Sequence, residues 1–207
     1  MLKIWDKFKA NFKINKKVFI FLCVIFIIGV IASSLFVTIL TIEDKKIVTD
    51  EITNFITNIE DINYITSMKN IFISNISFIL LAWLLGISII GIPISLIMLF
   101  GKSFILGFTV GSFILTYKLK GVLLSFIYVF PCQIINIFIL IYMFTYILIL
   151  SFKILESVTK KKSFDFKLVM NKYKKVLFTS LIIIVLSNLY EIFIMPSLIK
   201  LVLPLIK

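Results

Sequence analysis

Few residues in this 207-residue chain have the chemistry that catalysis or metal binding needs. The sequence contains no histidine, which excludes His-dependent acid–base catalysis, Ser–His and Cys–His nucleophile pairs and the usual His-containing zinc sites. Cys23 and Cys132 lie in separate apolar runs without a CxxC spacing, so we interpret both as small buried hydrophobic residues. The chain has no P-loop, HExxH or GxSxG pattern. We therefore expect no enzymatic activity and no metal or cofactor.

Polar side chains within apolar runs are the remaining candidates for chemistry. Glu191 is the only acid in such a run and follows Val176 by 15 residues, or about 23 Å of helix, which favours a position near the outer membrane interface. A buried contact with Asn188 or another helix, or a proton or ion site, stays open. Gln133 and Asn136 follow Pro131, whose ring frees a backbone carbonyl that these amides could satisfy. We take Gln133, Asn136 and Glu191 as candidate intramembrane polar contacts.

The composition indicates that a membrane surrounds these residues. Hydrophobic residues make up 61% of the chain and charged residues 15%, and the mean hydropathy is +1.15. Soluble domains carry about 25% charged residues, so this chain has more apolar surface than an aqueous core of its size can bury. The predicted fold is an all-α polytopic membrane bundle, with short amphipathic helices in the N-terminal segment 1–17 and in an external loop.

Long uncharged stretches predict five transmembrane helices and an apolar tail. Their ranges are 18–40, 71–101, 103–117, 121–152 and 176–196, followed by 197–207. The second and fourth stretches exceed a hydrocarbon core of about 30 Å, so they must tilt or bend, at Gly86, Gly91 and Pro93 in one and at Pro131 in the other. Gly107 and Gly111 form a GxxxG pair, which indicates close packing without choosing between an internal contact and a homo-oligomer. A re-entrant hairpin at 86–117 is the alternative to two full spans.

The distribution of lysines orients the spans. All 22 basic residues are lysines; six lie in 1–17 and eight in 153–175, so both segments are expected in the cytoplasm and the loop 41–70 outside. The net charge of +12 is then explained by topology and by contact with membrane lipid, and we expect no nucleic-acid partner.

Apolar residues recur at helical spacing in the external loop and predict an amphipathic helix of about 20 residues. The recurring residues that could form a partner face are Ile52, Phe55, Ile59 and Ile62. Such a helix could instead lie on the outer leaflet or on the top of the bundle itself.

Two glycine- and proline-punctuated stretches carry a resemblance to a known family. They are LLGISIIGIPISLIMLFGKSFILGFTVGSF, from Leu84 to Phe113, and YVFPCQIINIF, from Tyr128 to Phe138. With the lysine-rich start and the external acidic loop, they resemble the stage II sporulation protein M family of endospore-forming bacteria. The resemblance implies a non-enzymatic scaffold of the engulfment machinery in the mother-cell membrane at the asymmetric septum. It also implies two partners, the peptidoglycan hydrolases called stage II sporulation proteins D and P.

A second hypothesis is a permease-like subunit. In it, the spans bent at Pro93 and Pro131 line a path, and the loop 153–175 couples to a cytoplasmic ATPase. Co-purifying proteins would separate the two hypotheses, because only the first involves hydrolases and only the second a nucleotide-binding partner.

Overall fold

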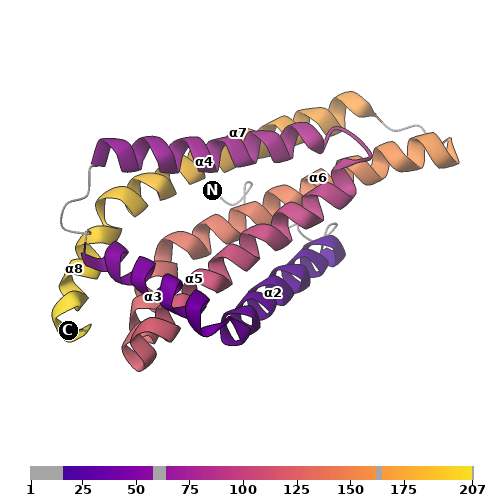
Figure 1. Ribbon diagram of the computed structural model, residues 1–207. Helices are drawn as coiled ribbons and strands as arrows, with labels where there is room; N and C mark the ends of the chain where they lie inside the picture. The colour runs from indigo at the N-terminus through magenta and orange to yellow at the C-terminus, as the bar shows by residue number, and fades with distance from the viewer. Residues whose placement is uncertain (1–15, 58–63, 162–164, 207) are drawn as a thin grey trace.

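The computed structural model describes residues 16–57, 64–161 and 165–206, and these are helical with short connections (Figure 1). The elements are α2 (Lys16–Ile39), α3 (Ile42–Thr57), α4 (Tyr64–Leu85), α5 (Gly91–Tyr128), the π-helical η2 (Val129–Gln133), α6 (Ile134–Lys160), α7 (Phe166–Phe193) and α8 (Met195–Ile206). No strand occurs in the described residues, and five helices are long and apolar enough to cross a membrane. The predicted all-α polytopic bundle is confirmed. Most of the predicted N-terminal helix, residues 1–15, lies outside the described ranges.

Small residues hold α2 and α5 side by side. A Cβ atom at Gly29 would meet Ser103, one at Gly107 would meet Val30 and Ser33, and one at Gly111 would meet Val37. The contacts at positions 29, 33 and 37 thus pair with 103, 107 and 111, so the two helices run parallel in constant register. Without side chains in the way, the backbones approach closely, as membrane helices with small residues at four-residue spacing do.

The predicted ends of the second and third spans are wrong. Helix α4 ends at Leu85, residues 86–90 form a turn, and α5 begins at Gly91, so the stretch 71–101 is two helices instead of one bent helix. Pro93 lies in the first turn of α5, where its missing N–H would have no intrahelical partner anyway. The first arm of α5, up to the break at Lys118, covers about 40 Å, which is long enough to cross the bilayer.

A sharp reversal divides α5. Lys118 has φ 52° and ψ −124°, a positive φ that is uncommon for a residue other than glycine. The chain then folds back on itself: a Cβ at Gly121 would meet the backbone of Phe113, and Ser125 Oγ, which donates to the Gly121 carbonyl at 2.7 Å, lies 3.3 Å from the Val110 carbonyl oxygen. The fourth predicted span, 121–152, therefore comprises the returning arm, the π-helical η2 with Pro131, and most of α6.

Interhelical contacts fix the direction of each helix. Ser151 Oγ, on α6, donates to the Gly86 carbonyl at 3.0 Å, and Tyr173 Oη, on α7, donates to the Trp83 carbonyl at 2.8 Å. The Trp83 and Tyr173 rings also stack, with centroids 5.5 Å apart. These contacts gather the α4–α5 turn, the second half of α6 and the first turns of α7 at one end of the bundle. Helices α2 and α7 and the first arm of α5 then run one way, and α4 and α6 the other.

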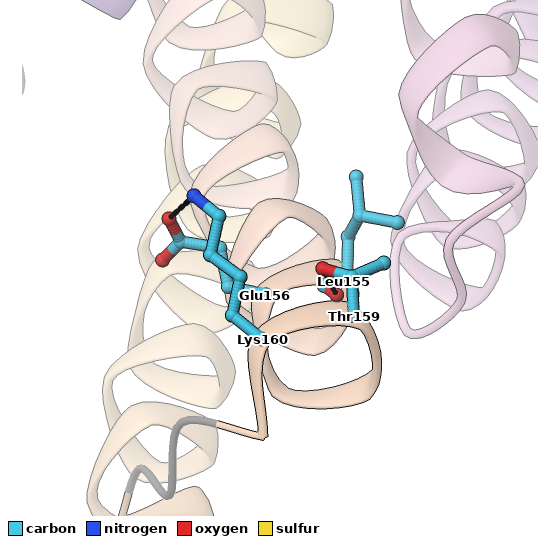
Figure 2. A network of polar contacts seen from close by, with 4 residues as sticks. All are labelled: Leu155, Glu156, Thr159 and Lys160. Atoms are coloured by element: carbon cyan, nitrogen blue, oxygen red, sulfur yellow. Dashed lines mark hydrogen bonds and ion pairs between the residues drawn. The ribbon is translucent and has the colours of Figure 1, made fainter.

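Helix α6 extends past the α4–α5 turn (Figure 1). Lys160 and Glu156 form an ion pair at 3.3 Å on its last turns, and Thr159 Oγ1 donates to the Leu155 carbonyl at 2.8 Å (Figure 2). Helix α7 begins after Asp165, whose carboxylate accepts a hydrogen bond from the Leu168 N–H at 3.0 Å. This lysine-rich end is the one that the positive-inside rule places in the cytoplasm.

The opposite end carries a helical cap. Thr41 is the N-cap residue just before α3 and makes two hydrogen bonds with Asp44. Its Oγ1 accepts from the Asp44 N–H at 3.2 Å and donates to Asp44 Oδ2 at 2.7 Å. The buried residues that join α3 and α8 to the α5 reversal are Ile56, Phe113, Leu124, Met195 and Ile199. We call these five residues the cap cluster. The predicted loop helix is described from Ile42 to Thr57 as α3, and the part of the prediction that falls on residues 58–63 lies outside the described residues.

Candidate functional site

A cavity of about 310 Å³ lies among α2, α4, α5, α6 and α7. Its apolar walls include Phe26, Phe78 and Leu140, and polar side chains occupy the remainder. Those polar lining residues are Asn70, Ser74, Asn75, Lys102, Thr109, Tyr128, Gln133, Asn136 and Glu191. A concave, mostly apolar site with a few convergent polar groups is the usual form of a small-molecule site.

Lys102 is the basic residue of the cavity. Its Nζ donates to Asn75 Oδ1 at 3.4 Å and lies 5.1 Å from the centroid of the Phe78 ring. Asn75 in turn donates from Nδ2 to Asn188 Oδ1 at 2.8 Å, so one amide of α4 contacts both α5 and α7. Asn188 is fully buried. Interhelical amide bonds of this kind contribute about 1 kcal/mol inside membranes and fix the relative positions of helices.

Glu191 is the acidic residue of the cavity. Its Oε1 accepts from Gln133 Nε2 at 3.3 Å, which links α7 to the π-helical segment η2. Its Oε2 is buried without a hydrogen-bond partner, and so is Oδ1 of Asn136, a residue that is only 9% exposed. Two acceptor oxygens in the cavity wall therefore have unused bonding capacity, a costly arrangement in an apolar surrounding unless something donates to them.

The two charged residues share the cavity without touching. Among the described residues the ion pairs within 4.0 Å comprise Lys160–Glu156 alone, so Lys102 and Glu191 are farther apart than that. Lys102 lies 11 residues beyond the start of α5 at Gly91, or about 17 Å along the helix, near the middle of a hydrocarbon core of about 30 Å. Ionisable groups at this depth are costly, and they usually mark binding sites or transport pathways.

The sequence did not indicate Lys102 as an interior residue. It interrupts two apolar runs, and the predicted spans 71–101 and 103–117 leave it between them. Gly91 and Pro93 were the available signal, because a helix that begins there carries Lys102 to mid-membrane. For Glu191, which we expected near the outer interface, the structure shows the alternative of a buried contact with another helix. Gln133 and Asn136 lie in the same cavity wall as Glu191.

The candidate packing residues lie at close contacts within one chain. Gly107 and Gly111 face α2, as described above, so the GxxxG pair makes an internal contact. A Cβ at Gly86 would meet the Tyr173 hydroxyl and lie 2.8 Å from Ile147, and one at Gly91 would lie 2.9 Å from Ser151 Oγ. The glycines of the α4–α5 turn thus let α6 and α7 close over it.

The candidate partner face is divided in the structure. Ile52 packs against the cap cluster next to Ile56, which is 4% exposed, whereas Phe55 is 44% exposed. Helix α3 thus packs on the end of the bundle through Ile52 and Ile56, and its other side, with Phe55, is exposed. Ile59 and Ile62 lie outside the described residues. Apolar spacing alone does not separate the two, because Phe55 and Ile56 follow Ile52 by three and four residues, both of which are helical neighbours.

The charged and amide groups of the cavity suit ligand binding by hydrogen bonds. Among the residues that the structure describes, no three or more Cys, Asp or Glu side chains gather where they could hold a metal ion. One ammonium, one carboxylate and several amides instead offer hydrogen bonds and two separate charges.

Comparison with known proteins gives one match. Residues 18–196 match the family described as stage II sporulation protein M. Neither a curated protein sequence nor a solved structure matches the chain.

Proposed function

The chain belongs to the stage II sporulation protein M family, since the match covers the whole bundle from α2 to the start of α8, and on that premise we propose a scaffold function. It is a multi-pass sporulation membrane protein. In our proposal it is a non-enzymatic part of the engulfment machinery in the mother-cell membrane at the asymmetric septum. Its partners are stage II sporulation proteins D and P, peptidoglycan hydrolases that it anchors and localises.

The observation that carries this proposal is the helical cap on the external end. Ile52 and Ile56 fasten α3 to the bundle, and α8 packs on the same cluster through Met195 and Ile199. Because α3 is held on one side, its outward side is a fixed surface. There Phe55 is 44% exposed and Ile47 is 61% exposed, eight residues apart and thus on one face of the helix. Exposed apolar side chains on a folded extracytoplasmic surface suit protein contact.

The test changes this face without changing the cap cluster. Phe55→Asp places a charge on the outward face, and Thr53→Asp is the matched control, since Thr53 is exposed on the same helix. Tagged full-length variants are purified from sporulating cells, and the co-purifying proteins are identified by mass spectrometry. We expect Phe55→Asp to abolish recovery of both hydrolases and Thr53→Asp to retain it, with equal membrane insertion.

Two outcomes would contradict this. Unchanged recovery with Phe55→Asp would remove α3 from the partner surface. Absence of both hydrolases from the unaltered protein's complex would reject the scaffold role itself.

A permease-like subunit is the second candidate, favoured by the polar cavity and by the lysine-rich extension of α6. A cavity with two charged residues at membrane depth could hold a solute, and the α6–α7 connection could contact a cytoplasmic ATPase. Recovery of a nucleotide-binding protein, lost when Lys160 and Lys161 are changed to Glu, would support this candidate. A purified complex without such a protein, together with no solute flux in vesicles, would reject it.

A further inference from the structure

The cavity described above has a distribution of charge that the scaffold function does not explain. Acceptors lie on its α6 and α7 side, where Glu191 Oε2 and Asn136 Oδ1 have no partner. A ligand that donates two hydrogen bonds would satisfy both oxygens. A primary ammonium is such a ligand, because its three N–H groups also carry the charge that complements a carboxylate.

The α5 side of the cavity carries the positive charge of Lys102 and therefore suits a negatively charged group. Lys102 has three N–H donors, and its side chain has one oxygen partner among the described residues, Asn75 Oδ1 at the long distance of 3.4 Å. The Phe78 ring adds only a cation–π contact. An ammonium in an apolar region is stabilised far more by an anion than by an amide, so this wall suits a phosphate or another acidic group.

The surroundings of the cavity indicate where such a ligand comes from. Helices α4 and α5 diverge from their shared turn (Figure 1), and Ser74 on α4 and Ile105 on α5, which both line the cavity, are exposed. Ile105 is 62% exposed, and in a membrane this flank of α5 faces lipid. The cavity therefore opens sideways into the bilayer, and its volume of about 310 Å³ is at the lower end of the range for small-ligand pockets.

We propose that this cavity binds the headgroup of a phospholipid that carries a primary ammonium, with the phosphate at Lys102 and the ammonium at Glu191 and Asn136. The lipid enters between α4 and α5, and its apolar part stays along Ile105 and the neighbouring apolar wall. The separation of Lys102 from Glu191 fits this binding mode. A direct ion pair between them would neutralise both charges, and neither would then be available to the phosphate or the ammonium of the headgroup. This binding site does not depend on the scaffold function.

The first experiment compares headgroups on the unaltered protein. The full chain is delipidated in mild detergent and offered equimolar phosphatidylethanolamine, phosphatidylcholine and phosphatidylglycerol with the same acyl chains, and the lipid retained is measured by native mass spectrometry. Phosphatidylcholine keeps the positive charge but has no N–H donors, and phosphatidylglycerol keeps the phosphate but has no ammonium. We expect about tenfold higher retention of phosphatidylethanolamine, as loss of charge-assisted hydrogen bonds predicts.

The second experiment locates the lipid. Glu191→Gln keeps the side chain's size and removes its charge, so it should abolish the preference for phosphatidylethanolamine. Lys102→Met should lower retention of all three lipids, because all three carry the phosphate. Glu156→Gln and Lys160→Met are the matched controls: they make the same changes in the exposed ion pair of α6 and should leave retention unchanged.

Equal retention of the three lipids by the unaltered protein would overturn the proposal, whatever the variants do. An unchanged headgroup preference in Glu191→Gln together with unchanged retention in Lys102→Met, with both variants shown to be monodisperse and folded, would place the lipid elsewhere and overturn it too. If either cavity variant fails to fold, the headgroup comparison on the unaltered protein still decides. A cavity that serves protons or a free solute gives no headgroup preference.

Discussion

The close packing of α2 on α5 leads to a quantitative prediction for Gly107. A Cβ atom there would lie 2.7 Å from the Val30 carbonyl oxygen and 2.9 Å from Val30 Cα, and closer still to Ser33 Oγ. Two of these atoms are backbone, so no rotamer change can make room and the helices must separate. Gly101, on the same helix, has nothing within 4 Å of its Cβ position. The pair Gly107→Ala and Gly101→Ala therefore compares the same change with and without the contact.

The magnitude follows from two opposing effects. Each substitution gains about 1 kcal/mol of helix propensity at most, and this gain cancels in the comparison because both positions lie within α5. Overpacking against a fixed neighbour costs about 1–3 kcal/mol. We therefore expect Gly101→Ala to be neutral or slightly stabilising and Gly107→Ala to be less stable than Gly101→Ala by about 1–3 kcal/mol.

The assay is denaturant unfolding of both purified variants in the same detergent, followed by circular dichroism, with the oligomeric state measured by light scattering. The reasoning is refuted if the two variants have the same unfolding free energy. It is also refuted if Gly107→Ala changes the oligomeric state and leaves the stability of the monomer unchanged, because the glycines would then form a contact between copies of the chain.

Three further predictions test other parts of the fold. Tyr173→Phe removes the hydrogen bond to the Trp83 carbonyl but keeps the stacked ring, so the unfolding free energy should fall by about 1 kcal/mol; a loss of more than 3 kcal/mol would mean that the ring contact had also been lost. Asp165→Ala removes the N-cap of α7 and should lower hydrogen-exchange protection in its first turn, at a cost of about 1 kcal/mol, while α6 stays unchanged; equal protection in the variant would contradict the cap. In a chain whose two native cysteines have been replaced, a cysteine at Glu43 should react with an impermeant maleimide from outside and one at Lys160 only after the membrane is opened; the reverse pattern would contradict the orientation.

The number of spans could be predicted from the sequence, whereas their orientation stays the lysine-based prediction that maleimide labelling checks; both rest on additive quantities. Apolar length and the placement of lysines act through the membrane and do not require knowledge of which helices touch. The helix ends could not be predicted in the same way. A lysine between two apolar runs predicts the end of a span, yet Lys102 is accommodated within α5 because Asn75 and Phe78 of α4 lie beside it.

The candidate site was predictable only in part, for a related reason. Gln133, Asn136 and Glu191 stand out as polar residues in apolar runs, and the structure places them around one cavity. Asn75 and Lys102 complete that cavity, but nothing in the sequence marks them as cavity residues. Their position follows only from the end of α4 at Leu85 and the start of α5 at Gly91. On α3 the spacing of apolar residues indicated an amphipathic helix but not its rotation, so Phe55 and Ile56 are distinguished only by the cap cluster.

The cavity and the cap cluster are connected by shared helices. Substitutions in the cavity are therefore expected to affect the cap cluster, whereas Phe55→Asp is not expected to affect the cavity. Glu191 is four residues before Met195, so the cavity wall of α7 and the cap cluster are one helical turn apart. The first arm of α5 likewise carries both Lys102 and Phe113. A substitution in the cavity that shifts α7 would thus reach the cap and weaken partner recruitment indirectly. Phe55→Asp changes only an exposed side chain and should leave lipid retention unaltered, so the cap variant is the cleaner test of the scaffold and the headgroup comparison the cleaner test of the cavity.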